Sequence, residues 1–265
     1  MLTVPISAVV VTYNESHILE PCLQSLAFCE EIIGVDLGSI DSSKVLLEKY
    51  TRQVYDFNRT PVVEEVKNFA LSFASFDWIL FIDPDERIDV SLPEYLCAII
   101  QQDDRKTAIV NVPWLFYYKR KALKGTFWGQ HNQGKDILIH KQRASVNLYV
   151  HGGYKEKQGF TKKYVRRNGT NVLHHYWMSS FAQLLAKHKM YILKEGEAKY
   201  KQGVRYSSKK QLKNILTEFY DSFIIFKGYR DGFTGLWLSM FRSWYIYQSW
   251  NSLKKFQSRL PGRGN

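Results

Sequence analysis

The first 112 residues alternate short apolar runs with stretches of helical periodicity. Continuous apolar runs are typical of strands buried on both faces, whereas apolar positions three and four apart predict amphipathic helices. The pattern predicts strands over residues 6–12, 31–36, 53–57, 77–82 and 107–112. It predicts helices over residues 15–28, 41–50, 62–74 and 91–102. This alternation predicts an α/β fold in which helices flank a mostly parallel sheet.

The rest of the chain follows a different pattern. Residues 113–170 are irregular and rich in Tyr, Lys and Gly, which predicts short strands and loops. From Ser179 onward apolar residues recur at helical spacing in three successive stretches, and the tail from Lys254 to Asn265 is expected to fray. We therefore divide the chain into three segments, 1–112, 113–178 and a helical extension, 179–265.

Charge is unevenly distributed along the 265 residues, whose net charge is +12. Residues 1–150 carry 15 Lys/Arg against 19 Asp/Glu, whereas residues 151–265 carry 22 against 6. Hydrophobic residues make up 45% of the chain, which excludes wholesale disorder. The basic second part suits an anionic partner, such as a membrane surface, a nucleic acid or an anionic substrate.

Several features bear on the compartment. Cys22, Cys29 and Cys97 lack the spacing of a zinc site and indicate buried thiols in a reducing environment. The N-terminal MLTVPISAVVVTYNE has no basic region and too short an apolar run for a signal peptide. No stretch has the roughly 18 uninterrupted apolar residues of a membrane span. We expect a cytoplasmic protein, peripheral on the inner face of the plasma membrane.

Polar residues follow three of the predicted strands. Ligands bind beyond the carboxyl ends of the strands in such sheets, so these positions are candidate site residues. Thr12-Tyr13-Asn14-Glu15 follow the first strand, and Asp36 ends the second, before the turn at Gly38-Ser39. The Asp36 carboxylate could accept a hydrogen bond from the N3–H of uracil or from ribose hydroxyls. Capping and turn formation are the alternative roles for all of these residues.

Asp83-Pro84-Asp85 follows the apolar strand 77–82. Two carboxylates on a fixed base can hold a divalent cation, and such a cation neutralises a diphosphate and helps it leave. A surface acidic turn is the alternative, because a D-x-D pair alone is a weak motif. Lys67, on the helix before this strand, could reach a phosphate or could be a solvated lysine.

Four motifs in this order resemble the family-2 glycosyltransferases, which have the GT-A (Rossmann-like) nucleotide-sugar fold. They are V-V-V-T-Y-N-E at 9–15, V-D-L-G-S-I-D at 35–41, K-N-F-A-L at 67–71 and D-W-I-L-F-I-D-P-D-E-R at 77–87. The resemblance is continuous over residues 5–100 and weaker over 126–200. The most similar subgroup comprises bacterial enzymes that add a hexose to the inner core of lipopolysaccharide.

The resemblance implies a UDP-sugar donor, Mn²⁺ or Mg²⁺ as cofactor, and a glycan or lipid-linked glycan as acceptor. The donor would be bound by Thr12, Tyr13, Asn14, Glu15, Asp36, Lys67, Asp83, Pro84 and Asp85. Asp36 would lie near the base, Asp85 would be the more direct metal ligand, and Asp83 would lie nearer the ribose or the metal-bound waters. Segment 1–112 would bind the nucleotide sugar, and segment 113–178 would form the acceptor side of the same domain.

Family-2 enzymes invert the anomeric centre by direct displacement, which requires a general base near the acceptor hydroxyl. Relatives carry Val-His-Glu, but this chain reads Val150-His151-Gly152-Gly153 and lacks that glutamate. Asp136 and Glu156 are the base candidates that remain nearby. The departure also leaves open an altered acceptor or lost activity.

Three further residues are candidates with structural alternatives. His151 or His175 could complete the metal shell, since imidazole is a good ligand, or could be a histidine hydrogen-bonded in the core. Trp128 could stack on an acceptor sugar, or simply pack.

The extension 179–265 combines aromatic stripes with many lysines and arginines, as amphipathic helices at an anionic membrane surface do. Packing on the catalytic domain is the alternative. Two other functions remain open. One is a nucleic-acid-binding protein that uses the basic, aromatic second half, although no RNA-binding signature accompanies it. The other is a nucleotidyltransferase, although no Gly-rich basic loop precedes the first helix. We expect a hexosyltransferase with no nucleic-acid partner.

Overall fold

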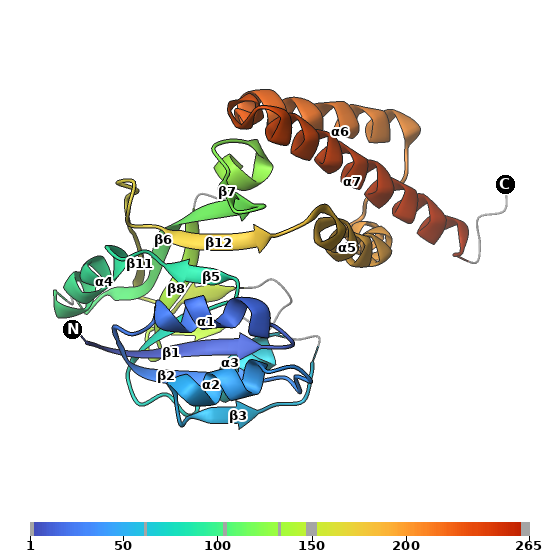
Figure 1. The fold of residues 1–265 in the computed structure, drawn as a ribbon. Coiled ribbons are helices and arrows are strands. Elements are labelled where there is room, and N and C mark those ends of the chain that lie inside the picture. Colours follow the sequence, from blue (N-terminus) through green and yellow to red (C-terminus); the bar gives the residue numbers. More distant parts are fainter. Residues whose placement is uncertain (1–2, 61–62, 103–104, 132–133, 147–152, 261–265) are drawn as a thin grey trace. The chain divides into compact units, whose positions relative to one another are not determined.

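The computed structural model describes residues 3–60, 63–102, 105–131, 134–146 and 153–260. The chain forms two compact units, which Figure 1 draws in sequence colours. The first unit comprises residues 1–115 and 134–175, and the second comprises residues 116–133 and 176–265. The predicted middle segment, 113–178, therefore contributes to both units.

The first unit is built on a mixed sheet, in which the described strands follow the order β3-β2-β1-β4-β8-β6-β12-β5. These strands are β1 (Val4–Thr12), β2 (Cys29–Asp36), β3 (Val54–Asp56), β4 (Trp78–Ile82), β5 (Glu86–Ile88), β6 (Thr107–Tyr118), β8 (Gly134–His140) and β12 (Leu173–Met178). β3, β2, β1 and β4 run parallel, whereas β8 is antiparallel to β4 and β6. β11 (Thr161–Tyr164) pairs with β6, and β9 (Ala144–Val146) pairs with β10 (Tyr154–Glu156) in a separate sheet.

Helices cover both faces of the parallel strands. They are α1 (Ser16–Gln24), α2 (Ser43–Tyr50), α3 (Val63–Leu71) and α4 (Leu92–Gln101). Ala8 and Val10 of β1 pack in the core that includes α1, α2 and α4, while Val9 packs in the core that includes α3. Successive side chains of a strand point to opposite faces, so a strand buried on both sides must be apolar throughout. The predicted α/β architecture is confirmed.

The predicted elements differ from the structure where the sequence has no clear period. The predicted helix 15–28 ends at Gln24, because Leu26 and Phe28 leave the helix to enter the core. β6 continues six residues beyond the predicted end at Val112. β5 was not predicted, since its Glu-Arg-Ile sequence gives no apolar run.

The second unit is mainly helical. Its elements are β7 (Lys121–Ala122), the π-helix η1 (Phe127–His131), α5 (Phe181–Lys201), α6 (Ser208–Tyr220), the π-helix η2 (Asp221–Ile225), the 3₁₀-helix η3 (Gly228–Asp231) and α7 (Phe233–Ser258). Ser180 and Ser207 are the N-caps of α5 and α6. Each side chain accepts a hydrogen bond from the backbone N–H three residues later, at Gln183 and Lys210. Within the described residues, no helix combines the length and the apolar character that crossing a bilayer requires.

Aromatic packing and one buried carboxylate hold the second unit together. Trp128 and Trp177 contact each other with ring centroids 4.5 Å apart, and both lie edge-on to His188 of α5. Asp231 is buried and accepts hydrogen bonds from the N–H groups of Lys124 (2.9 Å) and Gly125 (2.7 Å). Residues 116–133 are therefore part of the helical unit.

The predicted frayed tail is wrong for residues 254–258, which continue α7. Leu253 is fully buried, and the ring of Phe256 lies 5.4 Å from that of Tyr200 in α5. Packing against α5 therefore extends the helix beyond the point where sequence pattern alone would end it.

Helices α5 and α7 approach closely at Gly196, where an added Cβ would lie 2.4 Å from the Ser252 carbonyl oxygen. We expect Gly196→Ala to lower the free energy of unfolding by about 1–3 kcal/mol, because backbone rather than a mobile side chain must move. Glu197→Ala, at the next and exposed position of the same helix, should stay within about 0.5 kcal/mol of the wild type. Urea unfolding of both variants tests this, and equal stabilities would contradict the close approach.

Candidate functional site

The loops that follow β1 and β2 are tied together by hydrogen bonds. Asn14 donates its N–H to Ser39 Oγ (2.9 Å) and accepts at Oδ1 from the Ile40 N–H (2.8 Å). The Glu15 N–H donates to Ser43 Oγ (2.8 Å). Asn14 has a φ of 56°, a left-handed conformation that asparagine adopts more readily than most residues. These bonds fix the positions of the residues beyond two neighbouring strand ends.

Asp36 ends β2 and lies opposite Thr12 of β1 in the parallel register. Its Oδ2 accepts hydrogen bonds from the N–H groups of Gly38 (3.1 Å) and Ser39 (2.9 Å). Its Oδ1 is buried and has no hydrogen-bond partner among the described residues. A buried acceptor without a partner is costly, so this oxygen is suited to a donor that a ligand would bring.

Asp83, Pro84 and Asp85 form a turn at the carboxyl end of β4. The Glu86 N–H closes the turn on the Asp83 carbonyl oxygen (2.9 Å), and Glu86 Oε2 accepts from the Asp83 N–H (3.0 Å). Lys135 of β8 donates to Asp83 Oδ2 and to Glu86 Oε2, each at 2.6 Å. Pro84 is buried and Asp83 is exposed, so the turn presents its first aspartate to solvent while Glu86 and Lys135 hold it in place.

The charges in this turn shift one another's pKa values. Burial raises the pKa of Glu86 to about 7, although the Lys135 ammonium opposes the shift. The protein atoms crowded around Asp83 would raise its pKa even though its side chain reaches solvent, but the attraction of Lys135 outweighs this and lowers the pKa to about 2. Burial alone would lower the pKa of Lys135, yet Asp83 and Glu86 together raise it above its ordinary value. Asp83 and Lys135 are therefore a charged pair at neutral pH.

Glu15 lies close enough to the Asp83–Asp85 turn for their charges to interact. Burial, and to a smaller extent the negative charges of Asp85 and Asp83, raise the pKa of Glu15 to about 7. Hydrogen bonds from the Tyr13 N–H and the Thr12 hydroxyl, each 3.3 Å, work in the opposite direction. The ends of β1 and β4 thus form one acidic cluster.

The two adjacent histidines of β12 pair with different aspartates. His175 Nε2 lies 3.2 Å from Asp85 Oδ2, and its ring stacks on Trp114 with centroids 4.7 Å apart. His174 Nε2 lies 2.9 Å from Asp89 Oδ2. Of the two histidines predicted for a metal shell, His175 therefore lies beside a predicted ligand, and His151 lies outside the described residues.

Lys67 projects from α3 over two aromatic rings. Its Nζ lies 5.4 Å from the centroid of Phe81 and 4.7 Å from that of Tyr154. Its positive charge also lowers the pKa of Asp83. That a phosphate is bound by Lys67 stays a prediction, supported by the proximity of Lys67 to Asp83.

The two base candidates meet at a lysine. Lys162 Nζ lies 2.7 Å from Asp136 Oδ2 and 3.9 Å from Glu156 Oε1, and Asp136 Oδ1 accepts from Asn111 Nδ2 (2.7 Å). Asp136 follows Lys135 in β8, so their side chains point to opposite faces of the sheet. The structure therefore brings Asp136 and Glu156 together, on the other face of β8 from the Lys135 ion pairs.

Trp128, the predicted acceptor residue, belongs to the second unit and is only 5% exposed. Its ring packs against Trp177 and His188, and these contacts cover the ring surface in this structure. The acceptor role of Trp128 stays a prediction that this burial does not favour.

The described residues hold no group of three or more His, Cys, Asp or Glu side chains placed to bind a metal ion. The carboxylates of Asp83 and Asp85, and the imidazole beside Asp85, nevertheless have the donor chemistry that Mg²⁺ or Mn²⁺ accepts. Mg²⁺ is commonly held by one or two carboxylates together with substrate phosphates and water. The donor set therefore fits a cation that binds together with a diphosphate.

Sequence reasoning missed Lys135, Glu86 and Arg59. Glu86 directly follows the D-P-D motif, which was an available signal, but Lys135 reaches the turn only because β8 pairs with β4. The guanidinium of Arg59 lies 4.1 Å from the ring centroid of Tyr13. The contacts of Lys135 and Arg59 join positions far apart in sequence, so they become visible only in the folded chain.

Comparison with known proteins identifies the class of this fold and site. The model of the family described as glycosyl transferase family 2 matches residues 7–180, which is more than half of the chain. The chain belongs to glycosyl transferase family 2. This confirms the resemblance seen in the motifs, the GT-A-type fold and the glycosyltransferase class of enzyme.

Two relatives show how far the similarity extends. The chain is 34% identical over 122 residues to the lipopolysaccharide core biosynthesis glycosyltransferase LpsC of Rhizobium meliloti (strain 1021), covering 43% of this chain and 44% of LpsC. It is 26% identical over 247 residues to an uncharacterized glycosyltransferase of Rickettsia bellii (strain RML369-C), covering 91% of this chain and 83% of that protein. The chain thus aligns with less than half of LpsC and with most of the Rickettsia protein.

Two solved structures are similar over less than half of the chain. S. aureus TarS 1–349 in complex with UDP-GlcNAc is 22% identical, covers 48% of this chain and 39% of its own, and has a TM-score of 0.40. Glucosyl-3-phosphoglycerate synthase from Mycobacterium tuberculosis in complex with Mn²⁺ and UDP-Glc is 21% identical, covers 43% and 44%, and has a TM-score of 0.35.

The raised pKa of Glu15 predicts a pH-dependent effect of Glu15→Gln. Folding raises this pKa from 4.5 to about 7, so the wild type loses stability as pH rises through that interval and the buried carboxylate ionises. We expect Glu15→Gln to be more stable than the wild type by about 1–3 kcal/mol at pH 8, with the difference vanishing near pH 4. Glu48→Gln, at an exposed position of α2, is the control. Thermal unfolding at both pH values measures the effect, and a pH-independent difference would contradict it.

Proposed function

We propose that this protein is a metal-dependent, inverting glycosyltransferase that moves a glucose-like hexose from a UDP-sugar to a glycan acceptor. The observation that carries the proposal is the unpartnered, buried Oδ1 of Asp36 at the carboxyl end of the central parallel strands. Family membership supports the reaction class, and the strand-end side chains support the donor.

The base of the nucleotide is assigned to Asp36. Backbone N–H groups hold its Oδ2, which fixes the direction in which Oδ1 points. Such an oxygen can accept a hydrogen bond from the N3–H of uracil. Because the oxygen is buried, a base without that donor would leave it unpaired and would bind less tightly. Thr12, Tyr13, Asn14 and Glu15 would line the same pocket from β1, beside Asp36 in the register.

The diphosphate is assigned to the Asp83–Asp85 turn. A divalent cation bound there by Asp85, with Asp83 nearer the ribose or the metal-bound waters, would supply positive charge to the departing diphosphate. Four carboxyl groups, Glu15, Asp83, Asp85 and Glu86, lie in this region. The positive charges of Lys135 and Lys67 are among those that lower the pKa of Asp83. Lys135 neutralises and positions Asp83, which leaves the turn able to receive a cation.

In the transfer step the acceptor hydroxyl oxygen attacks the anomeric carbon as the bond to the UDP oxygen breaks. The configuration inverts, and a general base takes the hydroxyl proton. Asp136 and Glu156 remain the base candidates. The ammonium of Lys162 lies 2.7 Å from Asp136 Oδ2 and 3.9 Å from Glu156 Oε1, so both candidates lie beside the same positive charge.

The acceptor that we propose is the lipopolysaccharide inner core or another lipid-linked saccharide. The similarity to LpsC, which covers 43% of this chain, supports this class of acceptor. A lipid-linked acceptor would place the enzyme at the cytoplasmic face of the membrane, as a peripheral protein. The basic balance of residues 151–265 suits a phosphorylated glycan and an anionic bilayer.

Removal of the direct metal ligand tests the transferase assignment. We expect Asp85→Ala to lower kcat at least about a hundredfold, because the charge on the departing diphosphate loses its stabilisation, while the protein remains folded. Asp77→Ala, on the amino side of β4 and exposed, should transfer at the wild-type rate. Release of UDP with and without Mn²⁺ measures both variants. Full, metal-independent activity in Asp85→Ala would refute the assignment.

Asp36→Asn tests the nucleotide pocket separately from the chemistry. An amide can keep the Gly38 and Ser39 hydrogen bonds but would turn its NH₂ group toward the base, opposite another donor. We expect UDP to bind about 10–100-fold more weakly. Asp56→Asn, opposite Asp36 in the β2–β3 register and paired with Lys44, should bind UDP normally. Calorimetric titration with UDP and Mn²⁺ measures this, and unchanged affinity in Asp36→Asn would remove the main support for the nucleotide site.

A further inference from the structure

Helices α6 and α7 lie side by side in the second unit, and polar groups connect them (Figure 1). The Arg242 Nε donates to Glu218 Oε1 (2.6 Å), and the hydroxyl of Ser222, in η2 directly after α6, lies 3.0 Å from that of Ser239. The amide of buried Gln211 donates to the Tyr247 carbonyl oxygen (3.2 Å). The contact line between these helices is thus more polar than an ordinary helix–helix core.

Large apolar side chains of the same helices face outward instead. Among the described residues they form two stripes, Leu212, Leu216 and Tyr220 on α6, and Phe233, Met240 and Tyr247 on α7, and we call these six residues the outer face. Phe233 is 82% exposed, and Leu212 and Leu216 are about 60% exposed. Although α7 also buries large apolar residues such as Leu238 and Leu253, a row of exposed apolar side chains on both helices is not the arrangement expected for a helix pair that faces only water.

The two stripes lie on one side of the helix pair. Gln211 and Ser239 lie on the contact line, and Leu212 and Met240 directly follow them in sequence. One residue is a rotation of about 100° around a helix. The helices are antiparallel, because Gln211 meets Tyr247 while Glu218, later in α6, meets the earlier Arg242 of α7. The same rotation therefore turns both stripes to the same side.

Positive charge predominates in the segment that carries the outer face. Residues 208–258 contain eight Lys/Arg and three Asp/Glu. Lys209, Lys213 and Lys227 are exposed. In contrast, Glu218 is paired with Arg242, Asp231 is buried, and Asp221 is partly buried. No exposed acidic side chain lies in this segment, so the face would attract an anionic partner.

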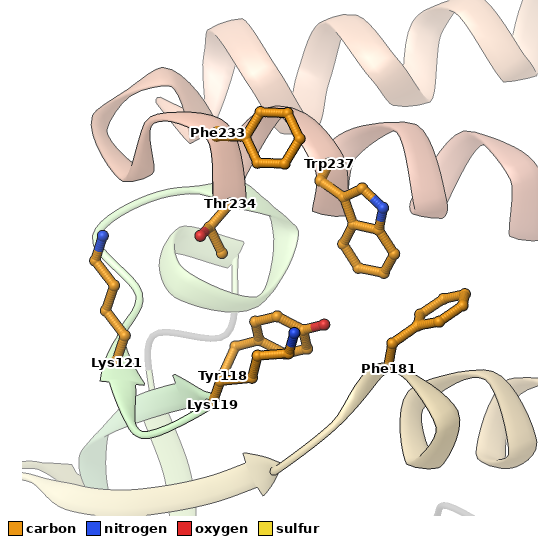
Figure 2. A pocket seen from close by; sticks show the side chains of 7 residues that line it. All are labelled: Tyr118, Lys119, Lys121, Phe181, Phe233, Thr234 and Trp237. Carbon is orange, nitrogen blue, oxygen red and sulfur yellow. The ribbon is translucent and has the colours of Figure 1, made fainter.

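A pocket of about 420 Å³ borders the outer face at Phe233. Figure 2 shows its side chains, with Phe233, Trp237, Tyr118 and Phe181 as aromatic walls and the amino groups of Lys119 and Lys121 at its margin. Aromatic rings together with lysines are characteristic of the bilayer interface, where rings sit at headgroup level and ammonium groups meet phosphates.

We propose that the outer face is a docking surface for an anionic lipid bilayer. Its leucine, methionine and aromatic side chains enter the headgroup region, its lysines contact lipid phosphates, and the pocket beside Phe233 receives one anionic headgroup. The inference deepens the proposed membrane-associated function by naming the surface that makes the contact, and it rests on that function only for the choice of membrane.

Two other occupants fit the surface less well. Symmetric pairing with a second copy would bring lysines against lysines around an apolar patch, which is unfavourable without anions between them. A single-stranded nucleic acid would use aromatic rings for base stacking, but Leu212 and Leu216 have no π-face to offer. An anionic bilayer satisfies both the aliphatic and the charged side chains.

Vesicle sedimentation tests the proposal with the full-length protein. We expect binding to phosphatidylcholine vesicles that contain about a quarter phosphatidylglycerol, weak binding to pure phosphatidylcholine, and a decrease with added salt. Leu212→Ser and Leu216→Ser should each lower the partition coefficient about tenfold, and Lys209→Gln and Lys213→Gln about fivefold each. Leu193→Ser, at an 82% exposed leucine of α5 outside the outer face, should bind like the wild type.

The outcomes separate the rival occupants and the proposed function. Wild-type protein that ignores phosphatidylglycerol, or equal loss in Leu193→Ser and Leu212→Ser, overturns the docking surface. So does a dimer in light scattering that Leu212→Ser makes monomeric, or an oligonucleotide affinity that Lys209→Gln abolishes while vesicle binding persists. UDP affinity is measured on the same samples and should not change in the outer-face variants. If the wild type did not bind UDP, the proposed transferase function would be refuted, whereas the conclusion from the vesicle experiment would be unaffected.

Discussion

Parallel pairing of β1 with both β2 and β4 is the constraint on which the site depends. It brings Thr12 opposite Asp36 and Val10 opposite Ile82, so three chain segments end at one edge of the sheet. Side chains placed there need no long loops to meet, because the hydrogen-bond register has already aligned them. The bonds from Asn14 and Glu15 to the loop after β2 then remove most of the remaining freedom. Side chains held in this way are largely positioned before a ligand arrives.

Charge compensation sets a second constraint at the same edge. Four carboxyl groups gather there, and their repulsion is reduced in two ways: Lys135 pairs with Asp83 and Glu86, while burial keeps the pKa values of Glu15 and Glu86 near 7. This partial neutralisation lets the acidic cluster exist in the free protein. Enough negative charge remains to attract a cation. The two aspartates of the turn differ in their partners, because Asp83 contacts Lys135 whereas Asp85 contacts His175.

The sequence was most informative where the local spacing of apolar residues also decides which residues pack together in the fold. The apolar run around Val10 predicted β1, and the residues following it predicted the site, because strand ends in a parallel sheet are geometrically equivalent. Lys135 could not be predicted, since its contact with Asp83 depends on the antiparallel pairing of β8 with β4. The burial of Trp128 could not be predicted for a similar reason: it depends on Trp177 and His188, which lie far away in sequence. Polar and aromatic residues in irregular segments take their roles from long-range packing that no local pattern encodes.

The interleaving of the two units has a consequence for biosynthesis. Residues 116–133 leave the ribosome well before α5, α6 and α7, yet their backbone N–H groups at Lys124 and Gly125 are bonded to Asp231, and Trp128 is packed against His188. Since these partners emerge last, the early segment must wait while the first unit completes its sheet with residues 134–175. Deleting the helical extension after residue 178 would therefore remove Asp231 and His188 from the segment that contains Trp128, and such a truncated chain would be prone to aggregation during synthesis.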